Sequence, residues 1–127
     1  MQLLLDTHIL IWFLNGDNQL TEEIKNSIKN LDNKCYVSMA SIWEIAIKTT
    51  LGKLNINISF DTLKLILIAN KIEVLPIDFE HIQQLLVLPP HHTDPFDRLI
   101  IAQAISEDIS IVTKDAKFDL YNVSLIK

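Results

Sequence analysis

The chain has 127 residues, with 16 acidic side chains against 11 basic ones, so its formal net charge is −5 at pH 7. A chain of this length usually forms one domain, and a hydrophobic content of 49% excludes a disordered protein. The acidic balance, without any run of four bases, excludes a protein that coats nucleic acid by charge alone. It leaves open an enzyme that reaches phosphate through bound metal.

Short apolar runs and helical periodicities alternate along the chain. In chain order they predict a strand at 3–5, helices at 8–14 and 21–31, a strand at 34–37, a helix at 41–51, a loop or short extended piece at 56–58, a helix at 60–70, a strand at 72–75, a helix at 79–86, an irregular segment at 88–92, a helix at 95–107, and strands at 110–112 and 123–126. Because the strands are apolar throughout and alternate with helices, we expect one α/β domain over residues 1–127. Its sheet should be mostly parallel, with four or five short strands and helices on both faces.

Residues with strong positional preferences mark several of these boundaries. Thr21 precedes two acids at a helix start, and Gly52 stands where a C-cap glycine is usual. Helix 60–70 carries so few polar residues that part of it either packs against another chain or is buried in its own core. Trp12 and Trp43 lie among aliphatic residues at helical spacing, which predicts core or interface positions rather than base stacking.

The lone thiol and the apolar N-terminus bear on the cellular compartment. Cys35 cannot form an internal disulfide and lies in an apolar run, so we expect a buried thiol in a reducing environment. Asp6 and His8 interrupt the first apolar run, which makes a poor signal peptide, and no apolar stretch approaches the roughly 18 residues that cross a bilayer. We therefore expect a cytoplasmic protein with no membrane contact.

Acidic residues cluster near the ends of the predicted strands. Asp6 ends the first strand, Glu44 follows the second, Asp94 and Asp97 open the helix that leads into strand 110–112, and Asp115 follows that strand. In an open parallel sheet, ligands bind beyond the carboxyl ends of the strands. If the sheet is parallel, four of these acids converge on one edge: Asp6, Glu44, Asp97 and Asp115.

Taken singly, each acid also has a purely structural explanation. Ser41 and Glu44 match the spacing of a capping box, in which the glutamate only satisfies a backbone donor. Asp94 is a good N-cap before a proline, and Asp97 would then favour the positive end of the helix. Asp115 could cap a turn.

Taken together, four carboxylates at one edge repel one another unless a cation neutralises them. Oxygen ligands at this density suit Mg²⁺ or Mn²⁺ better than Zn²⁺, and a metal held this way typically binds phosphate, which indicates phosphoester chemistry. His91 and His92 follow two prolines, so they either form a rigid loop beside the site or take a direct part in substrate binding or proton transfer.

Four segments of the chain, in order, carry the acids. They are Leu4-Leu5-Asp6-Thr7-His8; Ser41-Ile42-Trp43-Glu44-Ile45-Ala46-Ile47-Lys48 with Leu51-Gly52-Lys53-Leu54; His91-His92-Thr93-Asp94-Pro95-Phe96-Asp97-Arg98 with Ala102-Gln103-Ala104; and Val112-Thr113-Lys114-Asp115. Together they resemble the PIN domain family, and more narrowly its VapC-like toxin branch with the WEIAIK and HHxDPFDR signatures.

The resemblance implies a Mg²⁺- or Mn²⁺-dependent endoribonuclease, the toxin of a type II toxin–antitoxin pair. Its substrate would be RNA, and its partners a cognate antitoxin and a second copy in a homodimer. The catalytic and metal-binding acids would be Asp6, Glu44, Asp97 and Asp115. Supporting residues would be Thr7, Thr113 and Asp94. Residues expected to contact the substrate are Arg98, Lys48, Lys114 and His92, and Arg98 has the alternative of pairing with a site acid to orient it.

The last motif departs from the family pattern. Many PIN toxins end it with Asn and then Asp, whereas here Asp115 takes the first place and Phe118 the second, which makes Asp119 an alternative to Asp115. The expected mechanism is hydrolysis, with one metal held by Asp6, Asp97 and either Glu44 or Asp115, and with a second ion about 3.5–4 Å away if present. Two other functions stay open, a PIN-fold protein that binds RNA or a partner without cleavage and a housekeeping nuclease without an antitoxin.

Overall fold

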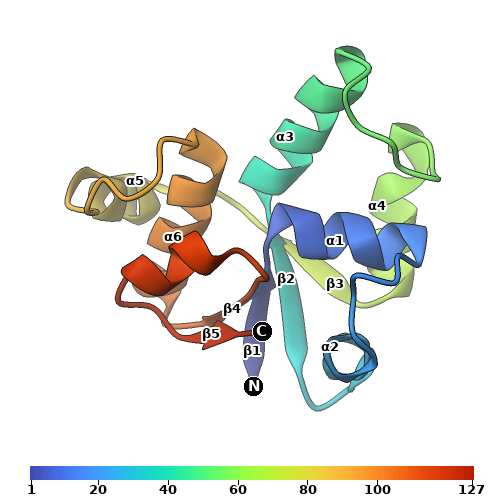
Figure 1. The fold of residues 1–127 in the computed structure, drawn as a ribbon, viewed down its shortest axis with the longest axis horizontal. Coiled ribbons are helices and arrows are strands. Elements are labelled where there is room, and N and C mark those ends of the chain that lie inside the picture. The colour runs from blue at the N-terminus through green and yellow to red at the C-terminus, as the bar shows by residue number, and fades with distance from the viewer.

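The computed structural model describes residues 1–127 and contains a five-stranded sheet flanked by helices (Figure 1). The strands are β1 (Gln2–Leu5), β2 (Lys34–Ser38), β3 (Ile72–Leu75), β4 (Ser110–Val112) and β5 (Leu125–Ile126). Their order in the sheet is β3-β2-β1-β4-β5, and every neighbouring pair is parallel. The expected α/β fold with a parallel sheet is confirmed.

Six α-helices and one 3₁₀ turn connect the strands. They are α1 (Thr7–Asn15), α2 (Glu22–Lys29), α3 (Met39–Thr50), α4 (Phe60–Ala69), α5 (Phe79–Leu86), α6 (Pro95–Glu107) and η1 (Ala116–Leu120). None of these helices has the length and apolar character that a membrane crossing requires. The sequence predicted all six α-helices to within two residues at each end, but it did not predict η1.

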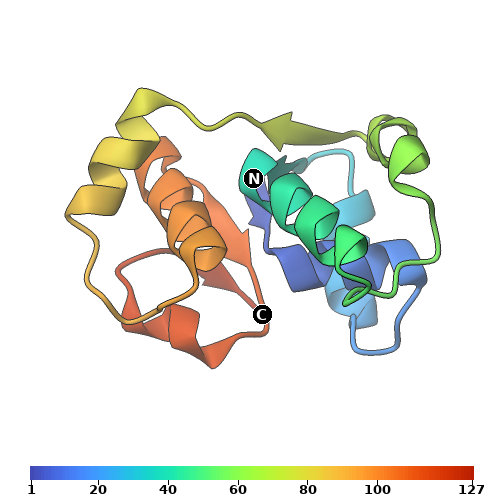
Figure 2. The ribbon, with the colours of Figure 1, turned by 90° about the horizontal axis from the view of Figure 1, so that it is seen from above.

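The two faces of the sheet build separate hydrophobic cores. Leu3 and Leu5 point to the face covered by α1 to α4, whereas Leu4 points to the face covered by α5 and α6, as expected for a strand with alternating side chains. All three leucines are fully buried. Figures 1 and 2 show the same division, with α5 and α6 on one side of the sheet and α1 to α4 on the other.

The strand order creates the place for a site. The chain leaves β1 for β2 and β3 on one side and later returns to the opposite side of β1 with β4. The order therefore reverses between β1 and β4, and such a switch point leaves a crevice at the carboxyl ends of the strands. Asp6 follows β1 and Thr113 follows β4, so both side chains lie at this crevice.

Several local predictions were wrong. The helix α3 begins earlier than expected because Ser38 is its N-cap, with its hydroxyl accepting the Ala40 N–H at 2.9 Å, so the proposed capping box of Ser41 and Glu44 does not exist. The helix expected to reach residue 31 ends at Lys29, and Leu31 beyond it is 77% exposed. Trp43 is 58% exposed, so of its two predicted positions the core is wrong and the interface stays a prediction.

Two other local predictions were confirmed. Gly52 has a φ of +66° just past the end of α3, a left-handed conformation that favours glycine. The thiol of Cys35 is free and buried in the core.

Candidate functional site

Asp6 is held firmly where β1 passes into α1. Its Oδ1 accepts the backbone N–H of Ile9 at 2.8 Å, which makes it the N-cap of α1, and its Oδ2 accepts the hydroxyl of Thr113. Only 3% of the residue is exposed, and this burial raises the pKa of the carboxyl, although the two hydrogen bonds oppose the rise. A carboxylate fixed by two donors has one orientation toward the crevice.

Glu44 enters the same region from α3 and is only 3% exposed. Its Oε2 receives Lys48 Nζ at 2.6 Å, while its Oε1 is buried without any hydrogen-bond partner. A buried charged oxygen without a partner costs free energy. The unpaired Oε1 of Glu44 therefore indicates that the site binds a group that would be its partner. The Thr7 and Ser41 hydroxyls lie 2.8 Å apart and join the starts of α1 and α3 beside it.

Asp97 lies in the first turn of α6. Asp94 caps this helix by accepting the backbone N–H groups of Phe96 at 2.8 Å and of Asp97 at 3.2 Å, as the sequence predicted. Burial, followed by the charges of Asp94, Glu44, Asp6 and Asp115 in that order, raises the pKa of Asp97 to about 7. The four expected acids therefore lie close enough to act on one another.

Asp115 completes the group from the segment after β4. It is the N-cap of η1, accepts the Lys117 N–H at 2.9 Å, and donates its own backbone N–H to Thr113 Oγ1 at 3.0 Å. Its carboxylate lies within 4.8 Å of ligand atoms of Asp97 and His92. Asp119, the alternative to Asp115, pairs with Lys127 at 2.6 Å, so Asp115 stays the preferred fourth acid.

The donor set fits a hard divalent cation. The acids supply carboxylate oxygens, Glu44 Oε1 lacks a partner, and burial together with neighbouring negative charges raises the pKa of Asp97. An open pocket of about 250 Å³ gives access to this charge and is lined by Asp6, His8, Trp12, Lys114 and Asp115. The arrangement can therefore hold a cation and admit a phosphate from solvent.

The basic residues near the acids have different surroundings. Lys48 pairs with Glu44, and that hydrogen bond raises the pKa of the lysine, whereas Lys114 is exposed on the pocket wall. Arg98 donates from Nη1 to the carbonyl of Pro89 at 3.0 Å and from Nη2 to that of Leu88 at 3.4 Å. Arg98 makes no ion pair, so its expected pairing with a site acid is wrong.

For two histidines, His92 and His8, the structure differs from what the sequence led us to expect. His92 was expected to contact substrate, but it is only 6% exposed, which leaves little surface for RNA. His8 was missed, although it lines the pocket and its charge lowers the pKa of Asp6. Its only sequence signal was its place two residues after Asp6, in the first turn of the following helix.

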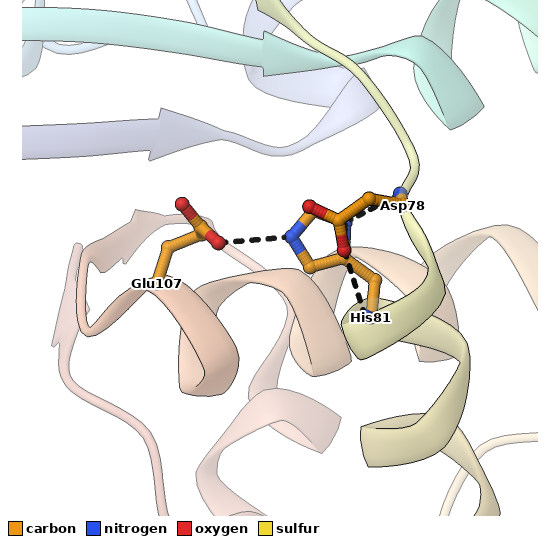
Figure 3. Close-up of side chains that lie close together, drawn as sticks. All are labelled: Asp78, His81 and Glu107. Carbon is orange, nitrogen blue, oxygen red and sulfur yellow. Dashed lines mark hydrogen bonds and ion pairs between the residues drawn. The ribbon is translucent and has the colours of Figure 1, made fainter.

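A second group of acids and histidine lies between α5 and α6, at Asp78, His81 and Glu107 (Figure 3). The Nδ1 of His81 accepts the backbone N–H of Asp78 at 3.0 Å, and its Nε2 donates to Glu107 Oε2 at 3.1 Å. The Asp78 carboxylate lies 3.3 Å from Nδ1 and the Glu107 carboxylate 3.1 Å from Nε2, so the ring of His81 contacts one acid through each of its nitrogens (Figure 3). This group is a structural joint that connects the two helices.

The parallel sheet and the acids at its switch point define an α/β protein with a carboxylate site at the ends of β1 and β4. The PIN domain family model matches residues 3–123, and the chain belongs to this family. No curated protein matches it in sequence.

Solved structures share the fold at low sequence identity. VapBC2 from Rickettsia felis, bound to a promoter DNA fragment, matches with a TM-score of 0.72 and 20% identity over 99% of this chain and 98% of that chain. VapBC-1 from nontypeable Haemophilus influenzae matches with a TM-score of 0.72 and 18% identity over 100% and 98%. FitAcB from Neisseria gonorrhoeae matches with a TM-score of 0.66 and 19% identity over 98% and 96%.

Proposed function

We propose that this chain is a divalent-metal-dependent endoribonuclease and the toxin of a type II toxin–antitoxin pair. The observation that carries the proposal is the meeting of Asp6, Glu44 and Asp115, from three distant segments, around Asp97, whose pKa burial and neighbouring negative charges raise to about 7. Such crowding destabilises the metal-free protein and is useful only if a cation binds. Membership in the PIN domain family and the likeness to VapBC and FitAcB structures support this choice.

Different residues of the site would bind the metal, orient its ligands and contact the RNA phosphate. Asp6 and Asp97, with Glu44 or Asp115, would hold Mg²⁺ or Mn²⁺ through carboxylate oxygens. When bound, such an ion lowers the pKa of a water and polarises a phosphate oxygen, which together promote hydrolysis of a phosphodiester. Thr113 fixes the orientation of Asp6. Lys114 is exposed at the pocket and is the base we assign to the phosphate of an incoming RNA.

An antitoxin is the partner that we assign to an apolar groove between α3 and α4. The groove has a volume of about 340 Å³ and is lined by Met39 and Ile42 of α3 and by Leu63 and Leu67 of α4. The same helix α3 carries Glu44, so a segment lying in the groove can extend toward the acids. The structural neighbours include toxin–antitoxin complexes, which supports an antitoxin as the occupant.

A second copy of the chain is the partner that we assign to α5. Phe79, Leu86 and Val87 are each more than 70% exposed there, which is unusual for large apolar side chains in a monomer. Figures 1 and 2 show α5 and α4 at opposite ends of the molecule, so an antitoxin and a second protomer can bind together. Charged substitution of Leu86 should then separate a dimer without loss of antitoxin binding.

Cleavage of RNA by the purified protein tests the proposed activity. We expect product with Mg²⁺ or Mn²⁺, none with EDTA, and none from Asp97→Asn. The matched control is Asp61→Asn, an exposed acid in the first turn of α4 that should leave cleavage unchanged. Cleavage that persists in EDTA and in Asp97→Asn contradicts the proposal.

Two results would favour the other functions. RNA binding without product under every divalent ion favours a non-cleaving PIN-fold protein. Growth arrest on expression, relieved by a neighbouring gene for a DNA-binding protein, supports the toxin, whereas cleavage without such arrest favours a housekeeping nuclease. The cytoplasmic location stays a prediction that fractionation of cells can check.

A further inference from the structure

One buried nitrogen in the acidic site has no partner. The side chain of His92 is only 3% exposed, and its Nε2 makes no hydrogen bond. This atom lies 3.7 Å from Asp115 Oδ2, too far for a hydrogen bond, and ligand atoms of His92, Asp97 and Asp115 all lie within 4.8 Å of one another. A buried polar atom that faces two carboxylates without bonding to either points to a group between them.

The ring of His92 is fixed on its other sides. It stacks on Tyr121 with the ring centroids 5.4 Å apart and meets Phe118 edge-on at 5.1 Å. The hydroxyl of Tyr121 accepts the backbone N–H of His92 at 2.8 Å and lies 3.2 Å from its Nδ1. Because these contacts set the plane and the position of the ring, Nε2 can face only the site.

The loop that carries His92 is also held in place. Two prolines precede His91, and Arg98 on α6 donates to the carbonyls of Leu88 and Pro89. The same helix carries Asp97, so Arg98 ties the histidine loop to the element that bears one of the site acids. The position of His92 relative to Asp97 is therefore built into the fold.

We infer that His92 Nε2 is a ligand of the divalent ion, beside the carboxylates of Asp97 and Asp115. This inference rests on the metal site of the proposed function and adds a nitrogen to its oxygen ligands. Adjacent and opposite ligands of a small divalent ion lie about 3–4 Å apart, which the 3.7 Å separation matches. With Nε2 on the metal, Nδ1 carries the proton and donates it to the Tyr121 oxygen, the usual arrangement of a metal-bound histidine.

A nitrogen ligand changes which ion the site prefers. Imidazole suits first-row transition ions, whereas Mg²⁺ favours oxygen and keeps several waters. The site should therefore bind Mn²⁺ more tightly than Mg²⁺, and His92 should account for the difference. Replacement of His92 should weaken Mn²⁺ binding by about tenfold or more, the scale of effect known for residues that support a metal site, and should weaken Mg²⁺ binding less.

Electron spin-echo envelope modulation spectroscopy of bound Mn²⁺, which detects nitrogen atoms coordinated to the ion, tests the inference without an activity assay. The wild-type protein with one equivalent of Mn²⁺ should show the modulation of an imidazole nitrogen, and His92→Gln should lose it. His91→Gln is the matched control, because that neighbouring histidine is exposed and meets Tyr121 only at a ring edge. Wild-type protein that binds Mn²⁺ without nitrogen modulation overturns the inference.

Two further measurements keep the test independent of folding and of catalysis. Tyr121→Phe keeps the ring stack and removes the hydroxyl, so it should retain the nitrogen signal while weakening Mn²⁺ binding severalfold; affinity equal to wild type contradicts the role given to that hydroxyl. RNA cleavage is measured on the same samples. Nitrogen modulation without cleavage would contradict the proposed ribonuclease function and support His92 as a metal ligand. Cleavage without nitrogen modulation would support the ribonuclease function and contradict His92 as a ligand.

Discussion

Thr113 donates its hydroxyl hydrogen to the carboxylate of Asp6, although the two residues stand 107 positions apart in the chain. The contact joins the carboxyl ends of β4 and β1 at the point where the strand order reverses. The same hydroxyl oxygen accepts the backbone N–H of Asp115 at 3.0 Å. One threonine thus orients one acid directly and a second through its backbone.

Thr113→Val should therefore weaken both the fold and the site. The change keeps the shape of the side chain but leaves Asp6 Oδ2 and the Asp115 N–H without their partner, which should lower the free energy of unfolding by about 1–3 kcal/mol. Urea denaturation of the metal-free protein measures this loss. Thr113→Ser keeps the hydroxyl and is the control; equal stability of the valine and serine variants would count against the role of the hydrogen bond.

The pKa of Asp97 predicts how stability depends on pH. Because the carboxyl has a pKa of about 7 in the folded protein against 3.8 ordinarily, the folded state holds an extra proton between those pH values. The free energy of unfolding of the metal-free protein should therefore fall as pH rises from about 4 to about 7, by at most about 1.4 kcal/mol per pH unit for this one group.

Asp97→Asn isolates that contribution. The amide carries no charge, so the variant should lose stability less steeply than the wild type over the same pH range and should be the more stable protein at pH 8. Thermal unfolding at several pH values, with EDTA present, gives the comparison. Parallel curves for the two proteins would show that Asp97 titrates at its ordinary pKa.

Lys48 should stabilise the protein more strongly in the absence of metal than in its presence. It is the one cation in contact with Glu44, whose side chain is 4% exposed. Loss of the partner of a fully buried charge costs about 3–5 kcal/mol, but the lysine side chain is 39% exposed, so we expect about 1–2 kcal/mol for Lys48→Ala. Calorimetry should find this loss in EDTA and a smaller one in Mn²⁺, with the exposed Lys53→Ala unchanged in both. An equal loss in both conditions would argue against metal near Glu44.

The role of Arg98, either in holding the loop at residues 88–89 or in binding phosphate, can be determined by measuring stability and RNA binding separately. Its guanidinium bonds to two loop carbonyls, so Arg98→Gln should speed hydrogen exchange in residues 88–93 and lower stability by about 1–3 kcal/mol. A phosphate-binding arginine would instead leave stability unchanged and weaken RNA binding with a smaller salt dependence. Hydrogen exchange and RNA titrations on the same variant distinguish these outcomes.

The sequence predicted those features that depend on local pattern or on strand direction. The strand at 72–75 and the helix at 95–107 match the structure because their ends carry strong signals, including the Asp94 cap. The convergence of Asp6 with Asp97 followed from the rule that parallel strands end at one edge. Side-chain partners could not be predicted, because the bonds of Arg98 to the 88–89 carbonyls and the burial of His92 depend on the path of an irregular loop.

Calorimetric titration of divalent metal into EDTA-stripped protein tests the central claim most directly. The account predicts that wild-type protein binds Mn²⁺ and Mg²⁺, that Asp6→Asn and Asp97→Asn bind each ion at least about tenfold more weakly, and that Asp61→Asn binds as the wild type does. Wild-type protein that binds neither ion, or an Asp97→Asn variant with unchanged affinity, would contradict it.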